Sequence, residues 1–238
     1  MKQDHVVIVW PPAYKIKKHR RAKSVKLRTS LQRGLEITVP YRFSMREIPF
    51  ILEENKDWII RHLSKLPAPL EDTLPASISL LSGENIWQVE YMPLRSKLEL
   101  FVQPDFKLVL AGRIENKTLC KKKLRAFLIN QAEKILIPLL NSLSRMLQLP
   151  YNSIRLRDQR TLWGSCTAHK AISLNYKLIF LPLELVRHVL IHELCHTKYL
   201  NHSLSFWDLV GQHDKNWEMH KAALRKADKF IPDWLATL

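Results

Sequence analysis

The sequence is poor in glycine and cysteine, and it has no long uninterrupted hydrophobic run. Five glycines among 238 residues argue against long flexible linkers. Three cysteines, Cys120, Cys166 and Cys195, form an odd set without paired spacing, so we expect no disulfide framework and a reducing compartment. No uncharged apolar stretch approaches the roughly 20 residues that cross a bilayer, and the N-terminus lacks a signal-peptide pattern. These absences favour a cytoplasmic protein without a membrane partner.

Acidic residues are also scarce relative to basic ones. The chain has 38 lysines and arginines against 22 acidic residues, a net charge of +16. Such a balance favours nucleic acid, ribosomes or acidic surfaces as neighbours, although it can also serve solubility alone. The densest basic run is KIKKHRRAK at residues 15–23. It could contact phosphate groups or form a solvated loop or strand edge, and both interpretations stay open.

Short alternating segments dominate the first 118 residues. We expect strands at residues 6–10, 24–28, 35–39, 86–91, 98–102 and 107–110. A capping-box pattern from Ser44 to Glu47 predicts a helix that carries Ile48, Leu52 and Ile59 on its apolar side. Three prolines mark a break at residues 66–76. This region predicts a mainly antiparallel β domain, residues 1–118.

Helical spacing begins near residue 119. Apolar residues recur at that spacing over residues 119–148, with Pro138 expected to kink or split the helix. Strands are expected at residues 153–157 and 172–176, a helix from Pro182 through residue 196, and a last helix at residues 215–229. The fold class is therefore α+β, with a compact helical domain and a small sheet at residues 119–238 following the β domain.

The segment HELCH, residues 192–196, carries the clearest chemistry. His192 and His196 are four residues apart, so on a helix both imidazoles lie on one face and can bind one metal ion. Glu193 lies beside them, the arrangement in which two histidines bind zinc and the glutamate is the general base. The segment predicts a zinc-dependent hydrolase, with a peptide bond as the first substrate to consider.

A catalytic zinc takes three protein ligands and keeps one open position. His202 is the candidate third ligand, because a chain that leaves the helix after His196 can return within six residues. The spacing equals that of the metzincins, although Tyr199 stands where they carry glycine. The oxyanion donor is not evident from the sequence, and Arg160 and Tyr199 are the candidates.

Three alternatives to a catalytic zinc peptidase are open. The motif could be a chance match on an amphipathic helix. The chain could be a basic nucleic-acid-binding module with a structural zinc, which would need a fourth ligand such as His188 or Cys195. It could also be a metal hydrolase acting on something other than peptides. The role of Glu193 distinguishes a catalytic site from the first two alternatives, because neither a chance match nor a structural zinc site uses that carboxylate.

Several neighbouring residues have a structural and a functional interpretation. We expect His188 to pack in the core or to support a ligand. We expect Cys166 and Cys195 to pack as small apolar side chains. Asp208 and Glu218 could orient a ligand histidine. His213 and His220 could line the cleft or lie at the surface.

The stretch from Arg157 to Trp207 resembles the YgjP-like metallopeptidases, relatives of the SprT and WLM groups. The resemblance rests on Arg160 with the WGSC segment 163–166, on LNYKL at 174–178, Pro182, HELCH, NHS at 201–203 and Phe206-Trp207. Looser agreement covers RAKSV at 21–25, the strand that ends at Pro40, and Asp57-Trp58-Ile59.

The resemblance implies a zincin-like domain in which His192, His196 and His202 bind zinc and Glu193 is the base. In zinc peptidases of this kind an exposed strand edge can pair with an extended substrate, which points to the strand at residues 172–176. Asn175 could then reach the substrate or brace the turn. Kinship with the SprT and WLM groups, taken with the charge, suggests a polypeptide substrate bound to nucleic acid.

Overall fold

The computed structural model describes residues 9–30, 34–64, 73–81, 85–159 and 161–236. They form two compact units, Met1–Glu71 and Asp72–Ala236. Both units combine sheets with helices, so the fold is α+β, as predicted. No helix in the described part of the chain is long and apolar enough to cross a membrane.

The first unit is a three-stranded sheet covered by two short helices. Its strands are β1 (Tyr14–His19), β2 (Lys26–Ser30) and β3 (Gly34–Pro40), in the order β1-β3-β2, with β1 parallel and β2 antiparallel to β3. The short helix η1 (Met45–Glu47) precedes α1 (Ile48–Glu54) and α2 (Lys56–Leu63). The core contains Leu35, Ile37 and Val39 from β3 and Ile48, Leu52 and Ile59 from the helices.

Two local predictions in this unit need comment. Ser44 precedes η1 as expected, but its side chain makes no capping hydrogen bond, so the capping box is not formed. Only Val9 and Trp10 of the strand predicted at residues 6–10 lie within the described residues, and neither is in a strand. The basic run instead forms β1 and the turn that follows it.

The second unit begins with a four-stranded sheet. The strands are β4 (Ser77–Leu80), β5 (Asn85–Pro93), β6 (Glu99–Gln103) and β7 (Lys107–Gly112), in the order β4-β5-β7-β6. The β5–β7 pair is parallel and the other two pairs are antiparallel. The apolar face of the sheet shares one core with the helix that follows. The division predicted at residue 118 therefore falls inside this compact unit, whose boundary is at Glu71.

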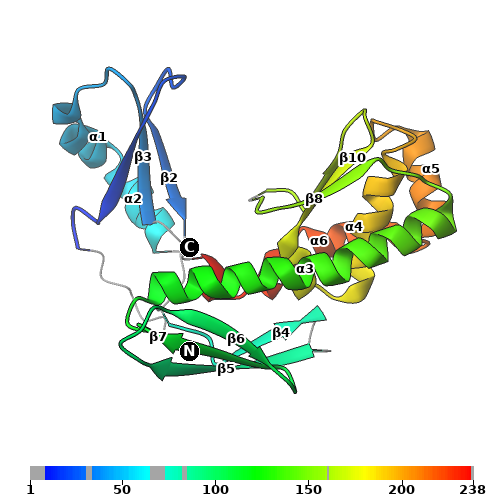
Figure 1. The fold of residues 1–238 in the computed structure, drawn as a ribbon. Helices are drawn as coiled ribbons and strands as arrows, with labels where there is room; N and C mark the ends of the chain where they lie inside the picture. The colour runs from blue at the N-terminus through cyan, green and yellow to red at the C-terminus, as the bar shows by residue number, and fades with distance from the viewer. Residues whose placement is uncertain (1–8, 31–33, 65–72, 82–84, 160, 237–238) are drawn as a thin grey trace, which may run out of the picture. The chain divides into compact units, whose positions relative to one another are not determined.

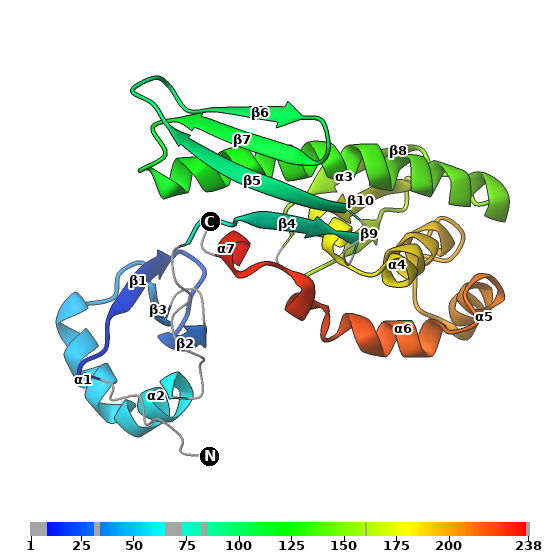
Figure 2. The same ribbon diagram turned by 90° about the horizontal axis from the view of Figure 1, so that it is seen from below.

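The long helix α3 (Lys117–Leu147) lies between two layers of the second unit (Figures 1 and 2). The four-stranded sheet covers one side of α3, and the small sheet with the C-terminal helices covers the other. Pro138 does not split the helix, because it is on the exposed side, where water can hydrate the carbonyl that loses its partner.

The last layer holds a short mixed sheet and the C-terminal helices. Strands β8 (Ser153–Arg157), β9 (Gly164–Cys166) and β10 (Ala171–Asn175) are in the order β8-β10-β9. The helices are η3 (Tyr176–Phe180), α4 (Leu183–Cys195), α5 (Leu204–His213), α6 (Trp217–Leu224), η4 (Ala227–Phe230) and α7 (Asp233–Ala236). The predicted helix at 215–229 is thus divided into α6 and η4.

Candidate metal centre

Three histidine side chains converge at the C-terminal end of α4. The Nε2 atom of His192 lies 3.2 Å from Nε2 of His196 and 3.1 Å from Nε2 of His202. The three nitrogens form a group that could hold a metal ion. The structure therefore brings together the three ligands that the sequence predicted.

Local structure explains how the three imidazoles meet. His192 lies on the last turn of α4, and His196 is the residue that caps this helix. The chain then turns, with the amide of Tyr199 donating to the carbonyl of Cys195, and reaches His202 just before α5 begins. The predicted exit from the helix after His196 is confirmed.

Aromatic rings fix the orientation of two of these histidines. The His196 ring stacks on Phe206, with ring centroids 4.4 Å apart. His202 stacks on Trp207, at 5.4 Å between centroids, and Trp207 stacks in turn on Trp217, at 4.4 Å. The exposed His202 therefore takes its position from a ladder of rings on α5 and α6.

Two of the three histidines, His192 and His196, are held in the neutral form that a metal requires. Burial, together with the neighbouring His196 and His202, lowers the pKa of His192 to about 3. Burial also lowers the pKa of His196, which outweighs the opposing hydrogen bond to the carbonyl of Tyr199. Nδ1 of His196 lies 2.9 Å from that carbonyl oxygen, so Nδ1 carries the hydrogen and Nε2 keeps its lone pair.

This donor set fits zinc. Ligands at about 2.0–2.1 Å from a tetrahedral zinc are about 3.3 Å apart, close to the observed separations of 3.1 and 3.2 Å. Three neutral imidazoles are a ligand set typical of zinc. Within the described residues, no fourth histidine, cysteine or carboxylate joins this group.

Glu193 is buried next to the three histidines and is only 4% exposed. Its Oε2 atom is inaccessible to solvent and has no hydrogen-bond partner. Burial raises the pKa of Glu193 to about 8. An unpaired buried carboxyl oxygen is costly unless something else satisfies it, which marks this position as a site for a ligand or a reacting water.

Strand β9 packs directly against this carboxylate. A Cβ atom on Gly164 would lie 2.6 Å from Oε1 of Glu193 and 2.7 Å from its Cγ, too close for any side chain. Glycine at position 164 therefore leaves room for Glu193, because any larger residue would have to displace the carboxylate.

The free strand edge beside Glu193 belongs to β9, not to the strand predicted at residues 172–176. That strand, β10, is paired on both sides, parallel to β8 and antiparallel to β9. The WGSC segment folds back on β10 through a turn, in which the amide of Lys170 donates to the carbonyl of Thr167. β9 therefore takes the edge position, and the predicted edge at β10 is wrong.

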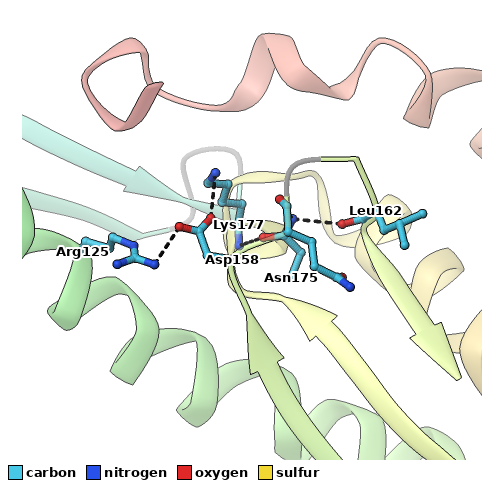
Figure 3. A network of polar contacts seen from close by, with 6 residues as sticks. Arg125, Asp158, Leu162, Asn175 and Lys177 are labelled. Atoms are coloured by element: carbon cyan, nitrogen blue, oxygen red, sulfur yellow. Dashed lines mark hydrogen bonds and ion pairs between the residues drawn. The ribbon is translucent and has the colours of Figure 1, made fainter. Parts of the chain in front are cut away.

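Asn175 braces a loop beside the site (Figure 3). Its Nδ2 donates to the carbonyls of Gln159, at 2.8 Å, and Leu162, at 3.0 Å, while its Oδ1 accepts from the amide of Lys177. The amide group is thus used within the protein, which agrees with the bracing role of the two that the sequence left open.

The same view shows an ion pair network next to this loop. Asp158 binds Arg125 at 2.7 Å and Lys177 at 3.0 Å.

Among the oxyanion candidates, Arg160 lies outside the described residues. Tyr199 contacts the centre through its backbone carbonyl, and its assignment as an oxyanion donor stays a prediction.

A second polar cluster lies one helical turn before the three histidines. Asp214 Oδ2 accepts from Nδ1 of His188 at 2.6 Å and from Nδ1 of His220 at 2.8 Å. These are hydrogen-bond distances, well below the ligand separations of a metal site, so the cluster is a buried hydrogen-bond network. It ties α4 to α6, which carries the end of the ring ladder.

The contacts of Asp214 correct the expectation for Asp208 and Glu218 and agree with the expectation for His188. Asp208 and Glu218, proposed to orient a ligand histidine, are exposed, and the carboxylate in this part of the structure, Asp214, instead orients His188 and His220. No sequence pattern marks Asp214, because it follows α5 and meets His188 across 26 residues. His188 is held by this carboxylate, in line with a supporting role.

The cysteines fit the packing interpretation. Cys195 is buried, and burial raises the pKa of its thiol to about 12, which opposes the thiolate form that binds zinc. Burial, with Glu193 nearby, raises the pKa of Cys166 to about 11. Neither thiol has the lowered pKa that is typical of a nucleophile.

Comparison with protein families agrees with this site. The model of the YgjP-like metallopeptidase domain matches residues 23–227, which covers most of the chain and every candidate metal ligand. The chain belongs to the YgjP-like family. Membership in this metallopeptidase family supports a metal-dependent hydrolase with a polypeptide substrate. No curated protein and no solved structure matches this YgjP-like chain.

Proposed function

We propose that this YgjP-like protein is a zinc peptidase whose metal is held by His192, His196 and His202. One observation carries the proposal: three imidazole nitrogens converge beside a buried carboxyl oxygen without a partner. A closed structural site has no use for such a carboxylate, whereas hydrolysis needs a base at that position.

The zinc would polarise the substrate carbonyl and lower the pKa of a bound water from about 15.7 towards about 7. Glu193 then acts through its unpaired Oε2, which accepts a proton from the attacking water. The same carboxyl group delivers that proton to the amine as the peptide C–N bond breaks. Burial keeps Glu193 away from bulk water, so its Oε2 is free to take the proton of a water held at the site.

The edge of β9 supports an extended peptide as the substrate. Trp163 accepts from the amide of Asn175, and Thr167 donates to Ala171, so these two residues bond towards β10. Because bonding direction alternates along an antiparallel strand, the amides and carbonyls of Gly164 and Cys166 point to the free edge. A peptide paired there would pass close to Glu193.

The rival function is a basic nucleic-acid-binding module with a structural zinc. The two suggested fourth ligands do not join the group: His188 is bound to Asp214, and Cys195 lies outside the set of converging donor atoms. An open position favours catalysis over structure. Hydrolysis of a bond other than a peptide bond would use the same site, and the β9 edge is the feature that favours peptides.

The test measures zinc content by mass spectrometry and cleavage of unfolded casein and of a protein bound to DNA. The proteins are wild type, Glu193→Gln, His202→Ala and His213→Ala, the last as a histidine control outside the group. We expect one zinc per chain in wild type, Glu193→Gln and His213→Ala, and loss of zinc in His202→Ala. Cleavage should occur only in wild type and His213→Ala.

Two results would count against the proposal. Zinc retained in His202→Ala, with activity that does not depend on Glu193, would favour the structural-zinc module. Zinc bound as expected, without cleavage of either protein substrate, would favour a hydrolase that acts on another bond. Cleavage of the DNA-bound protein in preference to casein would support the predicted association of substrate with nucleic acid.

A further inference from the structure

Positive charge is concentrated in one short part of the first unit. Residues 14–42 contain ten lysines and arginines and one acidic residue, Glu36, a net charge of +9 out of +16 for the chain. The other acidic residues of the described part of this unit lie on or next to α1 and α2. The sheet and the turn after β1 are therefore the cationic part of the unit.

Strand register places four of these cations on one face. Lys15 and Arg28 flank Glu36 in one row across the sheet, and Lys17 and Lys26 flank Thr38 in the next row. All four side chains are exposed. Residues of the alternate rows, such as Ile16, Leu27 and Ile37, pack into the core on the opposite side. We call the side with Lys15, Lys17, Lys26 and Arg28 the basic face.

The basic face continues beyond the strand ends. The turn from β1 to β2 carries Arg20, Arg21 and Lys23, all exposed. Tyr41, which follows β3, is 61% exposed, and the guanidinium carbon of Arg20 lies 5.9 Å from its ring centroid. An exposed aromatic ring beside cations offers a surface on which a nucleic-acid base can stack.

The spacing of these charges selects the kind of partner. Neighbours along a strand are about 6.7 Å apart on one face, and the two outer strands are about 10 Å apart, so the cations do not converge on one small anion. They form an array suited to a polymer with regularly repeated charges. Among the described residues of the basic face, Tyr41 at its end is the exposed side chain that could enter a lipid layer.

We infer that the basic face of the first unit binds the phosphodiester backbone of nucleic acid. Phosphate contacts from lysine and arginine give binding with little dependence on sequence. The candidate metal ligands all lie in the second unit, so this inference does not rest on the proposed peptidase function.

The experiment measures binding of the full-length protein by fluorescence anisotropy over a range of potassium chloride concentrations. The probes are labelled single-stranded RNA, single-stranded DNA and double-stranded DNA of mixed sequence, and vesicles with anionic lipid are tested by sedimentation. The face variant replaces Lys15, Lys17, Lys26 and Arg28 with glutamine. A control variant of equal net charge replaces Lys122, Lys134, Lys226 and Arg113, which are exposed in the second unit.

We expect the face variant to bind at least one nucleic acid about tenfold more weakly than wild type, and the control variant to bind nearly as wild type does. On single strands, losing four phosphate contacts should lower the salt slope of log K by roughly 3. The probe that binds most tightly identifies RNA, single-stranded DNA or duplex DNA as the partner. Circular dichroism checks that both variants are folded.

Three results would overturn the inference. The first is that wild type binds none of the three nucleic acids at about 100 mM salt, where non-specific phosphate contacts still give measurable binding. The second is an equal loss of affinity in both variants, which would assign binding to net charge. Vesicle binding that depends on the basic face, without nucleic-acid binding, would assign the face to lipid.

Discussion

Gly164 and Glu193 are in such close contact that the glycine has room for no side chain. A Cβ atom would come within 2.6 Å of Oε1 of the carboxylate. The glycine lies on the edge strand β9 and the glutamate on α4, so one contact joins the strand edge to the candidate base. The relation ties the WGSC segment directly to the chemistry proposed for HELCH.

Gly164→Ala should lower peptidase activity about a hundredfold, because the added methyl group must displace the Glu193 carboxylate by a sizeable fraction of an ångström. Zinc content should stay at one per chain, since the atoms nearest to the added methyl group all belong to Glu193. The control is Ser165→Ala on the same strand. Wild-type activity in Gly164→Ala, with an intact fold, would show that the position of Glu193 does not limit the reaction.

Replacing Trp207 with alanine should weaken zinc binding about tenfold, because His202 loses the ring on which it stacks. A competition titration with a zinc-binding dye measures the dissociation constant. Trp207→Phe keeps an aromatic ring and should recover most of the affinity. Equal zinc affinity in wild type and Trp207→Ala would mean that the ring ladder does not position His202.

Removal of zinc should lower the melting temperature of the second unit. A metal present at about a thousandfold excess over its dissociation constant stabilises the folded state by about 4 kcal/mol. For a unit of this size that corresponds to about 10 °C. Differential scanning calorimetry with and without a chelator measures the shift, and the transition of the first unit should not move. A shift confined to the first unit would contradict the assigned ligands.

In the metal-free protein, stability should fall as the pH drops below about 6.5, because burial keeps His188 neutral, as it does His192 and His196. Burial lowers the pKa of His188 despite the opposing hydrogen bond to Asp214, so the unfolded chain takes up a proton first on acidification. A further loss is expected below about 3.8. Burial would raise the pKa of Asp214, but the hydrogen bonds from His220 and His188 outweigh this effect and lower it.

Urea titrations of the metal-free protein between about pH 7 and pH 5 measure the first loss. Asp214→Asn should be less stable at neutral pH, because it removes the charge that both imidazoles face and its Nδ2 cannot accept from the amide of Asn216. His188→Gln should reduce the dependence on pH between these values. An unchanged slope in His188→Gln would assign the acid sensitivity to other groups.

Asn175→Ala should destabilise the second unit by about 1–3 kcal/mol, because the carbonyls of Gln159 and Leu162 lose their donor. Asn152→Ala is the matched control, since exposed Asn152 donates a single bond to the carbonyl of His169. Urea unfolding compares the two. Equal effects would mean that the buried amide of Asn175 does not brace the loop.

The convergence of His192, His196 and His202 could be predicted from the sequence because its geometry is local. His192 and His196 share a helix face because they are four residues apart. His202 follows six residues after His196, once the chain has left the helix and turned back. Family membership and the α+β class were also predicted correctly. The catalytic role of Glu193 and the identity of the metal stay predictions.

Features that depend on tertiary contact were missed. Asp214 meets His188 from a different helix end, and no spacing rule connects them. β9 has only three residues, too few for alternation to show, so the sheet edge was assigned to β10. The strands at residues 77–112 look like a continuation of the N-terminal sheet, although their apolar face packs on α3.

The stack of His202 on Trp207 and of Trp207 on Trp217 has an optical consequence. Indole emission changes with the groups that lie against the ring, and here one of those groups is a candidate metal ligand. Zinc binding at His202 would therefore alter the intrinsic tryptophan fluorescence of the protein. Occupancy of the centre could then be followed in real time without a label, a substrate or any catalytic turnover.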